Sequence, residues 1–235
     1  SGIVFIFLKN RKLQRQKVQQ EKQELELELY HNQLDPHFIF NTLQISGSKA
    51  LEHENFEFYD ILTKLSDVLR KHTRNAGRIV TLGEELELVQ AYCELVKESM
   101  PGEFDFDIAK NGVNLQQQVI KFSIQNFVEN AVKHGLEPET GRDDLWLGVT
   151  AGTQDDQSIK ILIEDNGRGF DPNKLKDQEK GTGLKNLETL FALYNKENKQ
   201  AMTFRHYKRS HCYPGTKGIC VELIIPKNYT FSYGQ

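Results

Sequence analysis

The hydrophobic pattern of the chain changes its period near residue 79, and this change constrains the fold more than any other feature of the sequence. Residues 9–34 contain no glycine or proline and are rich in Gln, Glu, Lys and Leu, a composition that favours a long helix. Farther along, apolar and polar residues alternate in 104–108 and in later segments, as they do in half-buried strands. We therefore expect a helical region over residues 9–78 and an α/β region over residues 79–235.

The helical region is expected to form an antiparallel hairpin that pairs with a second copy of itself. Leu13, Leu27 and Leu34 keep a seven-residue register, but Gln20 occupies the missing step, so a coiled coil is weakly specified. A polar run at 46–55 separates this helix from a second stretch with apolar residues at helical spacing. Those residues are Phe58, Ile61, Leu62, Leu65, Val68 and Leu69. Two such hairpins would make a four-helix bundle.

The second region interleaves helices with strands. Thr81 and Glu84 have the spacing of a capping box, which predicts a helix that Pro101 and Gly102 would end. Further helices are expected at 116–134 and 182–194, and strands at 104–108, 145–149, 159–163 and 218–226. This order predicts an α/β sandwich in which one sheet carries helices on one face.

The charge and the cysteine content argue against several classes of protein. Hydrophobic residues make up 38%, charged residues 27%, and the formal net charge is -3, so direct binding to nucleic acid is not expected. Cys93, Cys212 and Cys220 are odd in number and lack the paired spacing of a zinc site, so a disulfide framework has little support. A reducing cytoplasm is the favoured compartment.

The first residues have the pattern of a membrane span that ends on the cytoplasmic side. Residues 3–8 are wholly apolar, and a cluster of basic residues follows them. Six residues cannot cross a bilayer, which takes about 20, but an apolar edge before a basic cluster is typical of the inner end of a transmembrane helix. We expect residues 1–8 to be such an end or a cloning remnant; an ordinary frayed terminus is the alternative.

A first motif, "FVENAVKHG" at 127–135, is expected on a helix, where Asn130, Lys133 and His134 share one face. The side-chain oxygen of Asn130 suits magnesium, which takes its remaining ligands from water and phosphates. The charge of Lys133 suits the same phosphates. Taken alone, the motif is better interpreted as a solvated helix face.

Two glycine motifs follow. "DNGRGF" at 165–170 closes a strand, where an Asp can accept a hydrogen bond from an exocyclic amine such as N6 of adenine and glycines let a ring approach the backbone. On its own this motif is more often a simple turn. "GTGLKNL" at 181–187 opens a helix whose free N–H groups can hold an anion. It lacks the Lys-Ser/Thr end of a P-loop, so that class of ATPase is excluded.

A further motif, "DPHFIFN" at 35–41, interrupts the helical region. Asp35 is a good N-cap and Pro36 a good first helical residue, so the helix kinks or restarts here. His37 then lies in a first turn, where free N–H groups favour an anion. Alone, this histidine would be interpreted as a packing or capping residue.

Taken together and in this order, the motifs resemble those of a sensor histidine kinase of the LytS-like group, from about Gln33 to Pro226. The resemblance makes "QLDPHFIFN" the phosphoacceptor motif, "QNFVENAVKHG" the N box, and "DNGRGF" and "GTGLKNL" the two glycine boxes. It implies an α+β fold: a long-helix hairpin that forms a dimeric four-helix bundle, followed by an α/β-sandwich ATP-binding domain of the GHKL or Bergerat type.

The resemblance also implies ATP and Mg²⁺ as cofactors and assigns residues to the site. His37 would be the phosphoacceptor, oriented by Asn41, and Glu129 would serve in catalysis; Glu129 and Asp35 both stay open as the base that takes the proton of His37. Asn130 would bind the magnesium. The nucleotide-binding set is Asn126, Asn130, Lys133, His134, Asp165, Gly167, Gly169, Phe170, Gly181, Thr182, Gly183, Leu184 and Lys185.

The function implied is that of a two-component sensor kinase core. It would autophosphorylate His37 from Mg-ATP and pass the phosphoryl group to an aspartate of a response regulator, which in this family often carries a LytTR-type DNA-binding domain. It would act as a homodimer, anchored through a preceding transmembrane segment on the cytoplasmic side of the bacterial inner (plasma) membrane. Two alternatives stay open: a GHKL ATPase that uses Glu129 to activate water, and a degenerate kinase that serves as a dimeric scaffold.

The chain departs from the family pattern at three places. Glu188 and Thr189 follow the second glycine box, where basic residues are common. "MPGEF" at 100–104 stands where the family often has an Arg-Phe pair. "HCYPGTKG" at 211–218 looks longer than the usual hairpin between the last two strands. None of these changes removes a nucleotide-binding residue.

Overall fold

The computed structural model describes residues 56–74, 79–100, 103–139, 141–169 and 182–231 of the 235-residue chain. The elements, in chain order, are α3 (Phe56–Arg74), β1 (Ile79–Thr81), α4 (Leu82–Ser99), β2 (Phe104–Asn111), β3 (Gln118–Ile120), α5 (Ser123–Asn130), the π-helix η1 (Ala131–Leu136), the 3₁₀-helix η2 (Glu137–Glu139), β4 (Leu145–Thr153), β5 (Ile159–Asp165), α6 (Thr182–Asn195), β6 (Thr203–Lys208), the 3₁₀-helix η4 (Arg209–His211) and β7 (Ile219–Ile225). The predicted helix at 9–34 and the polar run at 46–55 lie outside the described residues.

Five strands form one mixed sheet in the order β2-β4-β5-β7-β6. β2 pairs with β4 in parallel, and the remaining neighbours are antiparallel. β1 and β3 form a separate two-stranded antiparallel ladder. The strands predicted at 104–108, 145–149, 159–163 and 218–226 are all confirmed within a few residues.

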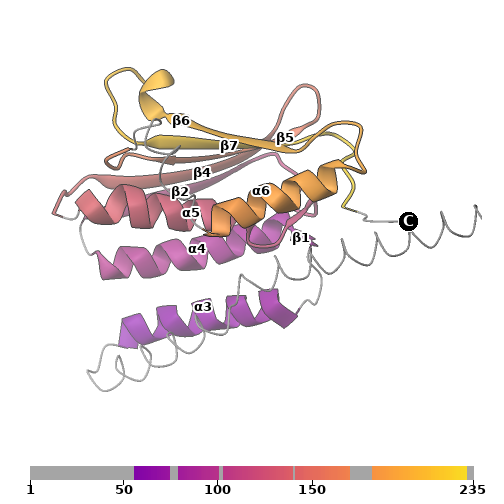
Figure 1. The fold of residues 1–235 in the computed structure, drawn as a ribbon. Coiled ribbons are helices and arrows are strands. Elements are labelled where there is room, and N and C mark those ends of the chain that lie inside the picture. The colour runs from indigo at the N-terminus through magenta and orange to yellow at the C-terminus, as the bar shows by residue number, and fades with distance from the viewer. Residues whose placement is uncertain (1–55, 75–78, 101–102, 140, 170–181, 232–235) are drawn as a thin grey trace, which may run out of the picture.

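Helices α4, α5 and α6 lie on one face of the sheet (Figure 1). Successive side chains of a strand point to opposite faces, so β5 turns Ile161 and Ile163 toward the helices and Lys160 and Leu162 away from them. Leu147, Val149, Ile161, Ile163 and Leu223 are buried in the core between the sheet and the helices. Full burial of one such side chain contributes about 1.5–3 kcal/mol, so this layer carries much of the stability. The predicted sandwich is confirmed.

Helix α4 begins at the predicted capping box. Thr81 has extended backbone angles, its hydroxyl accepts the N–H of Glu84 at 3.2 Å, and the carboxylate of Glu84 accepts the N–H of Thr81 at 2.7 Å. Two of the backbone donors that a helix start leaves without partners are thereby satisfied. At the other end, the N–H of Met100 bonds to the carbonyl of Val96 at 3.0 Å, just before Pro101.

Helix α3 packs against the outer side of α4 and adds a further helical layer (Figure 1). The contact is a small apolar cluster of Leu62, Leu65, Leu88 and Ala91, distinct from the main core. The helix predicted from the apolar spacing of residues 58–69 is therefore confirmed. Across the parts of the chain that the structure describes, none of the helices combines the length and the apolar character that crossing a bilayer requires.

The helix predicted at 116–134 begins later than predicted, and its last part is a π-helix. Gln118–Ile120 pairs with β1 as a strand, because Val119 and Ile120 are β-branched and bury against the core. Phe122 takes a left-handed conformation (φ 61°), and α5 begins only after it. Beyond Asn130 the α-helix widens into the π-helix η1, in which the N–H of Glu137 bonds to the carbonyl of Val132.

Candidate nucleotide site

Asp165 ends β5 and is almost fully buried. Its Oδ1 accepts the N–H of Gly167 at 2.9 Å, and the backbone N–H of Ile219 on β7 acts on the same carboxylate as a cause that lowers its pKa. Burial raises the pKa of Asp165 to about 6, while these two N–H groups and the charge of Arg209 act in the opposite direction. Near neutral pH the carboxylate is mostly ionised, and an ionised carboxylate is a strong acceptor for an amine.

The N box and the first glycine box are in direct contact. The N–H of Arg168 donates to the carbonyl of Gly135 at 3.0 Å. A Cβ on Gly167 would overlap that same carbonyl, and a Cβ on Gly135 would lie 3.0 Å from Oδ1 of Asp165. Gly169 has φ +73°, a conformation that suits glycine. The structure thus brings together two motifs that stand about thirty residues apart in the sequence.

Helix α5 carries Asn126, Glu129 and Asn130, all half-buried. The side-chain amide of Asn130 makes no hydrogen bond to any other residue in the described part of the chain, so its oxygen is available to a cation. The described residues also hold no cluster of three or more His, Cys, Asp or Glu side chains suited to a metal. This donor set fits a magnesium ion that enters with a nucleotide and takes most of its ligands from phosphates and water.

Glu129 lies one turn after Gln125 on the same helix. The Nε2 of Gln125 donates to Oε1 of Glu129 at 3.0 Å. Burial raises the pKa of Glu129, and the hydrogen bond from Gln125 and the charge of Lys133 partly offset this effect. A carboxyl group with a raised pKa is suited to take up a proton near neutral pH.

Lys133 and His134 lie in η1 rather than in the α-helix expected from the sequence, and both side chains are exposed. Bonding from residue i to i+5 makes a wider turn, so the α-helical spacing that placed these residues on one face with Asn130 does not apply unchanged. The carbonyl of His134 accepts the Nε of Arg168 at 3.0 Å. His134 therefore contacts the glycine turn through its backbone.

The second glycine box opens α6, which begins at Thr182 as predicted. Gly183 lies in its first turn, Leu184 packs against the core, and the side chain of Lys185 is exposed. A helix start of this kind presents free N–H groups to an anion. His37, Asn41, Phe170 and Gly181 lie outside the described residues.

Comparison with known protein families decides the kind of protein. A family model described as "Histidine kinase" matches residues 25–104, and one described as "Histidine kinase-, DNA gyrase B-, and HSP90-like ATPase" matches residues 115–227. The chain belongs to the histidine kinase family. The first match includes His37, and the second includes α5, β5 and α6.

Individual relatives give the same result. The chain is 28% identical to the sensor protein LytS of Oceanobacillus iheyensis, over 91% of this chain and 36% of that protein. It is 32% identical to LytS of Staphylococcus haemolyticus, over 72% of this chain and 30% of that protein. The resemblance to LytS-like kinases is confirmed, and the chain spans about a third of the length of these curated relatives. The histidine kinase domain of a blue-light activated kinase from Erythrobacter litoralis EL346 aligns with a TM-score of 0.47 and 14% identity, over 88% of this chain and 94% of that one.

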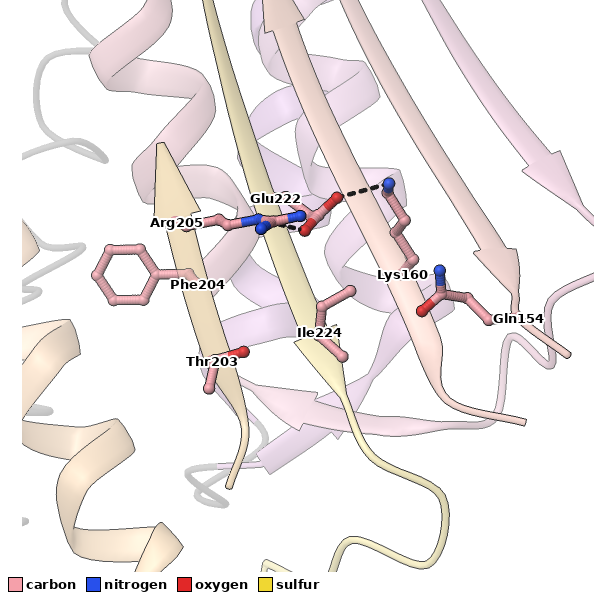
Figure 2. Close-up of a pocket in the computed structure, with 7 residues that line it drawn as sticks. All are labelled: Gln154, Lys160, Thr203, Phe204, Arg205, Glu222 and Ile224. Carbon is pink, nitrogen blue, oxygen red and sulfur yellow. Dashed lines mark hydrogen bonds and ion pairs between the residues drawn. The ribbon is translucent and has the colours of Figure 1, made fainter. Parts of the chain in front are cut away.

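A surface hollow of this histidine kinase contains no predicted site residue (Figure 2). It is lined by Gln154, Lys160, Thr203, Phe204, Arg205, Glu222 and Ile224, on the sheet face away from the helices. Glu222 pairs there with Lys160 and with Arg205, the latter at 2.7 Å. The carboxylate of Glu222 is paired with Lys160 and Arg205, so the described residues that line the hollow offer no unpaired charged groups to a ligand.

Sequence reasoning missed two residues that hold the candidate site in place. Gln125 has a usable signal, because it stands four residues before Glu129 on a helix. Glu85 has no such signal: its carboxylate accepts the N–H groups of Phe122 and Ile124, which are 37 and 39 residues away in the sequence. This carboxylate caps the start of α5 and so positions the N box.

Proposed function

We propose that the chain is the kinase core of a two-component sensor, which transfers the γ-phosphoryl group of Mg-ATP to His37. The observation that supports this proposal best is the contact of the buried carboxylate of Asp165 with Gly135 of the N box. This contact places Asp165, the proposed acceptor for the adenine amine, beside the helical segment that follows Asn130. Membership of the histidine kinase family supports the same conclusion.

In the proposed complex, Asp165 accepts a hydrogen bond from the N6 amine of adenine, and Gly167 and Gly169 let the ring lie against the backbone. The N–H groups at the start of α6, around Thr182 and Gly183, hold phosphate oxygens. Asn130 gives its side-chain oxygen to magnesium, and Lys133 adds positive charge. When bound, the metal supplies charge neutralisation for the phosphates.

A ring nitrogen of His37 forms the new bond to the γ-phosphorus, and the bond between that phosphorus and the bridging oxygen breaks as ADP leaves. The unperturbed pKa of histidine is about 6.5, so a free ring nitrogen is available near neutrality. The displaced ring proton goes to Glu129 or Asp35. Asn41, one turn beyond His37, orients the imidazole. The helix start at Pro36 then accommodates the added negative charge.

The phosphoryl group then passes to an aspartate of a response regulator, for which we propose the LytTR type. Residues 9–78 form the dimerisation and phosphoacceptor region of a homodimer, and residues 79–235 form the ATP-binding domain. We place the core on the cytoplasmic side of the bacterial inner membrane. The names of the LytS relatives, which are sensor proteins, support the role in sensing.

The raised pKa of Glu129 also supports a second candidate, a GHKL ATPase in which this carboxylate activates water. In that case the γ-phosphoryl group goes to water and His37 is not labelled. The two candidates share the nucleotide site and differ in the acceptor.

Incubation of the purified chain with γ-labelled ATP and magnesium separates these functions. We expect acid-labile, base-stable label on the parent and none on His37→Gln. His31→Gln, which changes a histidine six residues away, is the matched control and keeps the label. Label that persists on His37→Gln rules out His37 as the acceptor. Free phosphate without labelled protein favours the ATPase, and absence of both with no nucleotide binding favours the scaffold.

A further inference from the structure

The hairpin between β6 and β7 has no role in the function proposed so far. It contains η4 and a tight turn at Gly215, and it rises from the sheet on the side away from the helices (Figure 1). Part of this hairpin, residues 211–218, is the segment that looks longer than is usual between the last two strands. Its two arms meet where the N–H of Arg209 donates to the carbonyl of Gly218 at 3.0 Å.

The second arm of this hairpin lies directly against Asp165. Gly218 is buried with φ +108°, and a Cβ there would overlap the carbonyl oxygen of Asp165 and lie 2.9 Å from the Cα of Asn166. The backbone N–H of the next residue, Ile219, acts to lower the pKa of the Asp165 carboxyl. The position of this arm therefore affects both the packing of the Asp165 backbone and the electrostatic environment of its carboxylate.

The side chain of Arg209 fastens the hairpin to the sheet. Its Cζ lies 5.2 Å from the ring centroid of Trp146 on β4 and 4.9 Å from that of Tyr213 in the hairpin. A guanidinium between two aromatic faces is held by cation–π attraction at each. Its Nε lies 3.9 Å from Oε1 of Glu164, which immediately precedes Asp165. This arginine is thus packed against both strands that meet at the candidate site.

We propose that Arg209 is a positioning residue for the nucleotide base: it clamps the hairpin onto Trp146, holds Gly218 and Ile219 against Asp165, and thereby sets the preference for adenine. The inference rests on the proposed function, in which Asp165 accepts the adenine amine. Arg209 does not touch the nucleotide and acts through the N–H of Ile219 and through its own charge.

The charges around Asp165 determine whether loss of Arg209 raises or lowers the pKa of its carboxyl group. The charged or titratable side chains of the described residues on the elements packed near it include Lys133 and His134 on η1, Glu164 on β5, Arg168 in the glycine turn, Cys220 on β7, and Arg209, His211, Cys212, Tyr213 and Lys217 in the hairpin. Of these, Arg209 is the one whose charge lowers the pKa of Asp165 against the effect of burial. Removing it, and loosening the N–H of Ile219, would raise this pKa further. A larger fraction of Asp165 would then be protonated near neutrality and would accept an amine poorly.

The test compares binding of ADP and of inosine diphosphate, which has an oxygen in place of the adenine amine, to the full chain from pH 5.5 to pH 8. We expect the parent to prefer ADP. Arg209→Gln should weaken ADP binding about three- to tenfold, the effect of impairing one hydrogen bond, and leave inosine diphosphate binding unchanged. The pH midpoint of ADP binding should rise by about half a unit or more. Arg205→Gln, which removes an exposed guanidinium paired with Glu222, is the matched control and should change neither quantity.

Failure of this inference is distinguishable from failure of the proposed function. If the parent prefers ADP and Arg209→Gln keeps both that preference and its pH midpoint, Arg209 is not a positioning residue. If the parent itself binds both nucleotides equally, the proposed role of Asp165 is wrong. If Arg209→Gln does not fold, Tyr213→Leu, which removes a partly exposed ring and keeps the guanidinium, should shift the ADP preference in the same direction. An unchanged preference in Tyr213→Leu would then overturn the inference.

Discussion

Gly135 and Asp165 are packed so closely that a Cβ on the glycine would lie 3.0 Å from Oδ1 and 3.2 Å from Cγ of the aspartate. This contact joins the end of the N box to the acceptor of the first glycine box. It explains why a glycine occupies the π-helix η1, since a larger residue would displace the carboxylate. Because of this contact, a substitution in the N box can be used to test the role of Asp165 in the nucleotide site.

We predict that Gly135→Ala weakens ADP binding about tenfold, the value of one hydrogen bond to a charged group, because the new methyl group displaces the Asp165 carboxylate. The fold should persist, since the neighbour is the end of a side chain. Isothermal titration with ADP measures the effect. Gly152→Ala is the control, because a Cβ there meets ordinary contacts at 3.7 Å and beyond. Equal affinities of the two variants would contradict the proposed contact with the base.

ADP binding should also depend on the protonation of Asp165. Burial raises the pKa of this carboxyl from 3.8 to about 6, and the adenine amine requires the ionised form. Affinity should therefore be full above pH 7 and fall as the pH drops through about 6, by at most about tenfold per unit. Asp165→Asn should bind weakly and without this dependence, whereas Asp143→Asn, which changes an exposed carboxylate, should retain it. A flat profile of the parent between pH 5 and pH 8 would count against the assignment.

The stability of the nucleotide-free protein should depend on pH in the opposite direction to ADP binding. The folded-state pKa of Asp165 lies above its unfolded value, so the contribution of this group is present below pH 3.8 and is lost as the pH rises through about 6. Asp165→Asn, which carries no charge, should accordingly unfold at a higher temperature than the parent at pH 8. The two unfolding temperatures should converge near pH 4.

The sequence predicted the motifs that meet at the site because their chemistry is local. A glycine beside an aspartate at a strand end, and glycines before a helix, restrict the backbone in ways that few other residues allow. The contact of Gly135 with Gly167 was not predictable, since it depends on how η1 and the end of β5 pack. The capping box at Thr81 was predictable for the same local reason as the glycine turns.

The errors arose where tertiary contacts override local propensity. Residues 118–120 suit a helix by pattern but pair with β1, and the turn at Phe122 depends on the distant carboxylate of Glu85. No spacing rule links Arg209 to Trp146, because the hairpin between β6 and β7 brings them together. Such relationships need the fold before they can be inferred.

Asn130→Asp should weaken nucleotide binding in the presence of magnesium, about tenfold, because the oxygen of Asn130 is neutral and a carboxylate would repel the phosphates beside it. Binding without magnesium should weaken at least as much, because the phosphate charges that face the new carboxylate are then not neutralised. Asn114→Asp is the matched control: it makes the same change of charge in an exposed loop and keeps the oxygen that accepts the N–H of Gln116. Titration with and without EDTA gives the comparison. Equal affinity of parent and Asn130→Asp with magnesium would argue against the metal role.

The buried carboxylate of Glu85 should contribute measurably to the stability of the fold. Its two oxygens accept the N–H of Phe122 at 2.6 Å and of Ile124 at 3.1 Å, at the start of α5. Glu85→Gln replaces one acceptor with a donor and leaves a buried N–H unsatisfied, so we expect a loss of about 1–3 kcal/mol in the free energy of unfolding. Urea denaturation measures this loss. Glu87→Gln, exposed on the same helix, should stay within about 0.5 kcal/mol of the parent. If both variants unfold at the same urea concentration, the start of α5 is held by other contacts.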